Sequence, residues 1–169
     1  MVNALGVTTL DAVSSLFHGG NANVSWERAL DGLSAQQAQV IPAGLPHSVA
    51  GIVAHVQFWQ RYLLGVFRGE DPDWVDSAAE SWPGGAVHSL EEQNPEDWET
   101  LKLSLLRDMD SLAAYAQDEA FMQIHDPQGR FRIVPLTSFA GHGLYHLGQV
   151  VTIRQLIGAW PPPGGGDTW

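Results

Sequence analysis

The sequence has no cysteine and a single lysine, Lys102. Without cysteine the chain forms no disulfide, offers no thiolate to a metal and has no cysteine nucleophile. Any metal ion must therefore be held by histidine, carboxylate or amide oxygen. The 8 Lys and Arg residues stand against 19 Asp and Glu, a formal net charge of −11. This balance argues against a nucleic-acid binder, which needs a positive surface, and against docking to anionic membranes.

Long apolar runs are also missing. No stretch of about 18 apolar residues occurs, so we expect no transmembrane helix. The N-terminal residues lack a basic start and carry Asp11 within their apolar part, which makes a poor signal peptide. A cytoplasmic protein is the resulting expectation. The 169 residues suit one domain with a real core, which we assign to residues 1–160, followed by a Pro/Gly-rich tail over 161–169.

Apolar residues recur at helical spacing in several stretches. The pattern predicts helical segments over 8–18, 25–33, 34–40, 48–67, 94–117, and from 135 or 137 to about 158. Whether the first pieces form one kinked helix or two stays open, and residues 118–134 suit either a small hairpin or an irregular linker. Four main helical stretches predict an all-α fold, a four-helix bundle.

A long acidic connection separates two of these helices. More than half of the acids and no Lys or Arg lie between Glu70 and Glu99. The plain interpretation is a solvated loop; a cation-binding loop is an alternative, and a loop this long in a compact domain is often a lid over a site. Such a connection can join distant ends of a bundle, which makes one long crossover plausible.

His142 and His146 stand four residues apart in the last predicted helix. Four residues turn an α-helix by about 400°, so both imidazoles point the same way, one turn apart. His55 lies on the apolar face of the 48–67 helix and could supply a third ligand from a facing helix. Ordinary buried histidines, hydrogen-bonded to backbone or tyrosine and without metal, are the alternative. Gly143 follows His142, so the segment lacks the glutamate of the H-E-x-x-H zinc proteases.

Two stretches carry a resemblance to a known family. Residues 46–55, PHSVAGIVAH, and residues 141–150, GHGLYHLGQV, resemble the DinB-like family of damage-inducible, metal-dependent four-helix bundles. The resemblance implies an up-down-down-up bundle, often dimeric, with a divalent metal, nickel or zinc, on three histidines. By motif position these are His55, His142 and His146. The glycine pair at 19–20 and the long acidic loop depart from the simplest members.

Three other residues are expected near the histidines. Gln149 follows His146 by three residues and could hydrogen-bond a ligand histidine, although plain packing is nearly as good an interpretation. Trp59 and Tyr62 follow His55 at one and two turns and could wall the site, or be ordinary core aromatics. Tyr145 should point elsewhere. The remaining histidines are expected outside the ligand set, at the surface, at a helix start or in turns: His18, His47, His88 and His125.

Two functions fit these features. In the first, a divalent metal on three histidines keeps an open position, and the protein is a metal-dependent enzyme acting on a small molecule. The resemblance implies a transferase or isomerase that uses a low-molecular-weight thiol; hydrolysis is the other option. In the second, the metal is structural and the bundle is a non-catalytic binding or stress-response protein. No residue is identified as catalytic.

Overall fold

The computed structural model describes residues 9–19, 22–83, 95–126 and 129–166. Within these ranges the chain is helical and contains no strand, which confirms the all-α prediction. One isolated antiparallel bridge joins His125 to Phe131. The elements in order are α1 (Thr9–His18), α2 (Trp26–Leu30), α3 (Ala35–Ala38), α4 (Val49–Phe67), the 3-10 helix η1 (Ala78–Ser81), α5 (Pro95–Gln117), α6 (Glu119–Met122) and α7 (Ile133–Leu156).

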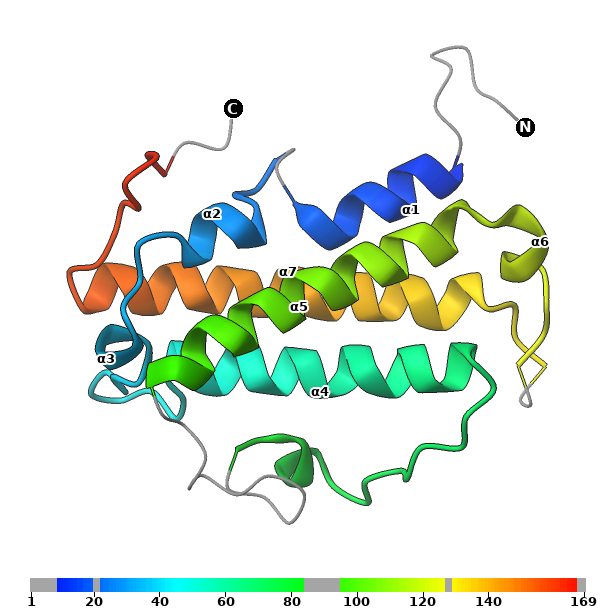
Figure 1. Cartoon of the computed structure of the whole chain (residues 1–169), viewed down its shortest axis with the longest axis horizontal. Coiled ribbons are helices and arrows are strands. Elements are labelled where there is room, and N and C mark those ends of the chain that lie inside the picture. The colour runs from blue at the N-terminus through cyan, green and yellow to red at the C-terminus, as the bar shows by residue number, and fades with distance from the viewer. Residues whose placement is uncertain (1–8, 20–21, 84–94, 127–128, 167–169) are drawn as a thin grey trace.

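Three long helices and α1 make the body of the molecule (Figure 1). Helix α5 packs against α1 and α4, and α7 packs against the same two helices. Followed by colour from blue to red, α4 and α5 run in one direction in Figure 1, whereas α1 and α7 run in the other. The connection between α4 and α5 must therefore return along the bundle. The packing of α4 against α7 matters most here, because these two helices carry the three histidines.

Short polar residues start several helices. The Ser48 side chain accepts a hydrogen bond from the backbone N–H of Gly51 at the start of α4 (3.1 Å), as expected of an N-cap. Ser25 caps α2, and Ser34 forms a reciprocal capping box with Gln37 in α3. The sequence pattern extended the α2 segment to residue 33, but the helix ends at Leu30, and the turn that follows contains Gly32 at φ +67°.

Helix α7 begins two residues before the earlier of its predicted starts. Pro135 lies in its first turn, where the missing N–H has no intrahelical partner to lose. The helix ends at Leu156, followed by Gly158 at φ +70°. In the 118–134 segment, the structure has the short helix α6, which the periodicity did not predict, and then a hairpin-like pairing in which Arg132 N–H donates to the Ile124 carbonyl (3.0 Å).

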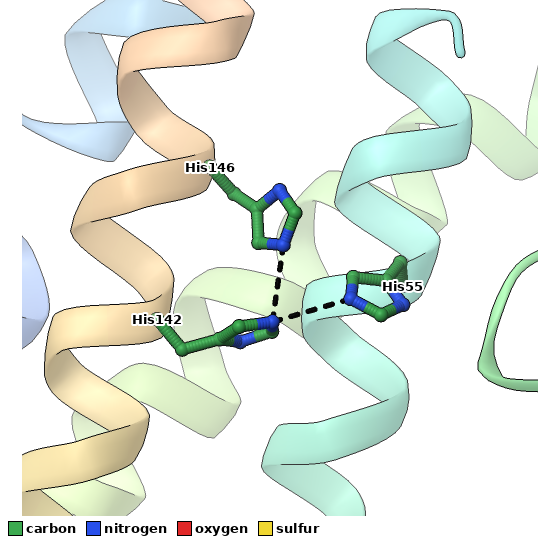
Figure 2. Close-up of side chains that lie close together, drawn as sticks. All are labelled: His55, His142 and His146. Atoms are coloured by element: carbon green, nitrogen blue, oxygen red, sulfur yellow. Dashed lines mark hydrogen bonds between the residues drawn. The ribbon is translucent and has the colours of Figure 1, made fainter. Parts of the chain in front are cut away.

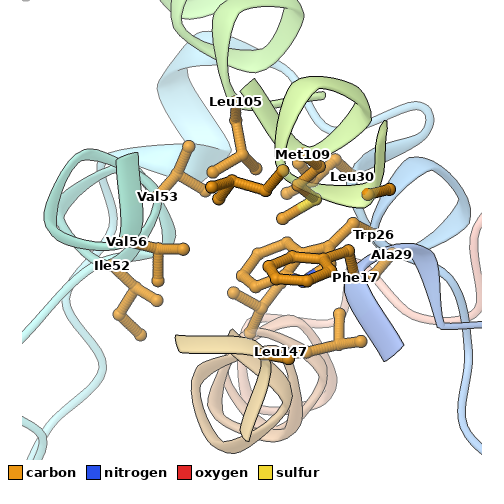
Figure 3. Close-up of a cluster of buried hydrophobic side chains, with 14 of the residues drawn as sticks. Phe17, Trp26, Ala29, Leu30, Ile52, Val53, Val56, Leu105, Met109 and Leu147 are labelled. Carbon is orange, nitrogen blue, oxygen red and sulfur yellow. The ribbon is translucent and has the colours of Figure 1, made fainter. Parts of the chain in front are cut away.

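The core lies among α1, α2, α4, α5 and α7 (Figure 3). Trp26 of α2 is almost completely buried between these helices, with Leu105 and Met109 of α5 and Leu147 of α7 in the same cluster. One buried charged residue crosses this region. The Arg154 guanidinium, 2% exposed, donates to the carbonyl oxygens of Ala29, Asp31 and Ala159. Those bonds tie the C-terminal end of α7 to the segment after α2.

The connection after α4 is described as far as Pro83. It is not wholly solvated: Val75 and Ser81 are buried, and η1 packs against α4, whereas the side chains of Asp71 and Asp73 are exposed. His88 and most of the predicted acidic loop beyond Pro83 lie outside the described residues. At the other end of the chain, Pro162 is buried and Gly166 lies against the Trp160 indole. None of the described helices is both long and apolar enough to cross a bilayer.

Candidate metal centre

Two adjacent helices bring three histidines to one point. His55 lies in the first half of α4, and His142 and His146 lie one turn apart on α7. Figure 2 shows the three rings converging in the space between these helices. The His142 Nε2 atom lies 3.2 Å from His55 Nε2 and 3.0 Å from His146 Nε2. Within the described part of the chain, these three histidines form a group that could hold a metal ion, with their ligand atoms all within 4.8 Å of one another.

The outer nitrogens of two rings are held by the protein. His55 Nδ1 lies 3.1 Å from the Ser81 carbonyl oxygen and 3.1 Å from Ser81 Oγ. That hydroxyl already donates to the Ala78 carbonyl (2.7 Å), so it accepts from His55, and Nδ1 carries the proton. His146 Nδ1–H likewise donates to Gln149 Oε1 (2.6 Å). Both rings therefore have an unprotonated Nε2 that points inward.

This arrangement fits a cation. Two inward lone pairs, on His55 and His146, face the Nε2 atom of His142. One proton on His142 Nε2 can satisfy one of these lone pairs, and the other is then left against a nitrogen without a donor. A metal ion accepts all three lone pairs at once, with ligand distances of about 2.0–2.1 Å to each nitrogen. Neutral imidazole donors with hydrogen-bonded outer nitrogens are the usual form of histidine metal ligands.

A family model describes the same part of the chain. The model of the DinB superfamily matches residues 23–149, a stretch that contains the three histidines and ends at Gln149. The chain belongs to the DinB superfamily. No curated protein and no solved structure matches it. This match confirms the family that residues 46–55 and 141–150 resemble. The matched region extends from α2 through most of α7.

Burial keeps the three imidazoles of this DinB-superfamily chain neutral. His55 and His146 are each 4% exposed. Burial, opposed by the hydrogen bond to the Ser81 carbonyl and assisted by the neighbouring histidines, lowers the pKa of His55 to about 4. Burial and the charge of His146 lower the pKa of His142 to about 4. Burial also lowers the pKa of His146, partly offset by Gln149. At neutral pH all three rings are in the form that binds metals.

The connection after α4 supplies partners of His55 that the sequence did not predict. The Trp82 indole stacks on the His55 ring with centroids 3.9 Å apart and planes 4° apart, and His47 stacks on the other face of Trp82 at 3.5 Å. Together with Ser81, Trp82 holds the His55 ring in place. No periodic pattern marks residues 81 and 82, because they lie at the end of the single-turn helix η1, whose position depends on packing against α4.

A large cleft reaches His142. It has a volume of about 1000 Å³ and follows the groove between α4 and α7. His142 lines it, as do Trp59 and Tyr62, the two aromatic residues expected beside the site. Trp59 contacts Phe139 across the groove, with ring centroids 6.2 Å apart. Trp74, from the connection, covers Trp59 and Tyr62 and is itself 66% exposed.

The other histidines that the structure describes lie outside the triad. His18 Nε2 pairs with Asp110 at the surface (2.8 Å). His47 lies at the start of α4, as the sequence suggested, but its stacking on Trp82 brings it closer to the triad than expected. His125 borders the far part of the large cleft. Tyr145 is largely exposed, in keeping with its expected direction, although its ring edge still approaches His146.

Proposed function

We propose that this DinB-superfamily protein binds one divalent metal ion through His55, His142 and His146 and uses it to act on a small molecule in the adjoining cleft. The observation that carries the proposal is the convergence of three Nε2 atoms, one of them from His142, which lines a cleft of about 1000 Å³. Zinc or nickel is the proposed ion, since neutral imidazole suits both. The up-down-down-up bundle is part of the same proposal, and the helix directions in Figure 1 support it.

Three protein ligands leave room for a fourth. A bound divalent ion supplies Lewis acidity, which polarises a carbonyl or lets a water or thiol lose its proton near neutral pH. Among the chain's own residues, Ser81 and Gln149 orient the ligand rings through their outer nitrogens. Trp59 and Phe139 give the cleft apolar walls beside His142, which reduce the access of bulk water.

The proposed reaction type rests on the resemblance to the DinB-like family. We propose a transferase or isomerase that uses a low-molecular-weight thiol, with hydrolysis as the other option. Both need a Lewis-acidic centre open to a cleft, and a cleft of this volume accommodates a drug-sized molecule. The absence of a cysteine means that any thiol must come from a second small molecule. We also propose a homodimer, to be checked by the molar mass in solution.

Metal content tests the proposal directly. Protein purified without a nickel column is analysed by mass spectrometry of its metals, next to the variants His55→Ala, His142→Ala and His146→Ala. About one divalent ion per chain is expected in the native protein and little in each variant. His125→Ala, which removes a histidine outside the triad, is the matched control and keeps its metal. Full metal content in all three triad variants would refute the site.

A structural role is the second candidate function. The triad joins α4 to α7, and Ser81 adds the connection after α4, so a metal there would brace three segments. Thermal unfolding with and without a chelator separates the two roles. A large loss of stability without metal favours the brace. A small loss, with turnover in a screen of thiol and ester substrates that needs the metal, favours catalysis.

A further inference from the structure

The large cleft runs away from the histidines to a polar end. His142 lines one end, and Arg132, at the start of α7, lines the other. Their separation along α7 is about 15 Å, from a rise of about 1.5 Å per residue. The aromatic side chains of Trp59 and Phe139 lie beside the His142 end. The cleft therefore has a histidine end with aromatic walls and a charged end, where Arg130 and Asp126 line it together with Arg132.

Arg132 has no acidic partner among the residues that the structure describes. None of the ion pairs between described residues includes Arg132, although the chain has 19 acids and only 8 bases. Its neighbour Arg130, in contrast, is paired with Asp126, whose Oδ2 accepts from Arg130 Nε and Nη2 at 2.8 Å each. A partly buried guanidinium without a carboxylate, in so acidic a protein, is a group available to a ligand.

Aromatic rings hold the Arg132 guanidinium in place. Its Cζ atom lies 4.1 Å from the centre of the Phe121 ring and 5.9 Å from that of Phe67. Stacking of this kind uses the face of the guanidinium and leaves the N–H donors at its edge free for hydrogen bonds. Those donors match the two oxygens of a carboxylate in a bidentate pair. The side chain is thus positioned to receive an acid group without first losing much freedom.

We propose that the cleft binds an elongated molecule with an apolar or aromatic body and a carboxylate, and that Arg132 binds this carboxylate at the end remote from His142. This specifies the substrate class of the proposed function and rests on it. Arg132 is a binding and specificity residue, about 15 Å along the helix axis from the triad. Three acids, Glu70, Asp71 and Asp126, line the same cleft, and Asp126 is paired with Arg130. A ligand with a cationic end is therefore the competing possibility.

Calorimetric titration with three matched probes tests the inference. The probes are phenylhexanoate, its uncharged amide, and the corresponding amine, phenylhexylamine. On the native protein the acid should bind about tenfold more tightly than the amide, the size of one charge-assisted contact. In Arg132→Gln this preference should disappear, and Arg132→Lys, which keeps the charge and loses the bidentate geometry, should fall between the two.

The matched control is Arg68→Gln. Arg68 is exposed at the end of α4 and outside the cleft, so this variant loses the same charge and should keep the preference for the acid. Four results would overturn the inference: the acid and the amide bind equally, the preference for the acid over the amide survives in Arg132→Gln, the amine binds most tightly, or no probe binds. The titrations are repeated after chelation, and metal content is measured in Arg132→Gln. Native protein without metal would refute the proposed function. The ratio of acid to amide affinity would still test the role of Arg132, because it does not depend on the metal.

Discussion

Gln149 provides the sharpest test of how the metal centre is built. Its Oε1 atom accepts the Nδ1 proton of His146 at 2.6 Å, and His146 is 4% exposed, so water cannot easily replace it. In Gln149→Leu the side chain keeps a similar size and loses the acceptor. The His146 proton then either stays unpaired on Nδ1, at a cost of about 1–3 kcal/mol, or moves to Nε2 and removes a lone pair from the site.

Both outcomes weaken metal binding. Loss of a partner behind a ligand histidine typically reduces metal affinity by about 10- to 100-fold, which corresponds to about 1.4–2.8 kcal/mol. Competition of metal-free protein with a chromophoric chelator for zinc measures this change. Nuclear magnetic resonance of the histidine ring nitrogens measures the tautomer independently, and should show the His146 proton on Nδ1 in the native protein.

Two further variants complete this test. Gln149→Glu keeps an oxygen acceptor and should bind zinc at least as tightly as the native protein. Gln155→Leu makes the same replacement at an exposed position of α7 and should change nothing. If Gln149→Leu binds zinc within about twofold of the native protein, the argument from the outer hydrogen bond is wrong.

Three other predictions concern His55, the core and acid. Trp82→Ala, which removes the ring stacked on His55, should weaken zinc binding by about tenfold in the same competition assay. Arg154→Met leaves three backbone carbonyls without their buried donor and should lower the free energy of unfolding in urea by about 3 kcal/mol. Metal-free protein should lose stability as pH falls from about 6.5 through about 4, because burial lowers the pKa of His55 and His142 and the unfolded chain binds more protons there. A double variant, His55→Gln with His142→Gln, should flatten that profile; an unchanged profile would contradict the assignment.

The long helices could be predicted because each of them needs only local information. Apolar residues at helical spacing mark α4 and α5, and Ser48 supplies the cap at which α4 begins. The four-residue spacing of His142 and His146 is likewise a property of one helix. Short helices were harder: α6 has a single turn, too short for any periodicity to be visible, and α2 ends earlier than its apolar pattern.

Parts of the site that come from irregular backbone could not be predicted. Ser81 and Trp82 reach His55 because the connection after α4 folds back against that helix, and nothing in residues 70–83 specifies this contact locally. The position of Arg132 at the far end of the cleft is a similar case. The hairpin-like pairing at Ile124 places Arg132 there, against the rings of Phe121 and Phe67.

By itself, the sequence determined the long helices, the chemistry of the ligands and the shared direction of His142 and His146, since cysteine is absent and helical geometry relates neighbours four residues apart. Only tertiary packing, of α4 against α7 and of the connection against α4, decided that His55 meets that pair, that Ser81 orients the His55 ring, and that a cleft ends at His142. These contacts join residues up to 87 positions apart. Their geometry depends on how side chains of separate helices fill a common core, which no local pattern encodes.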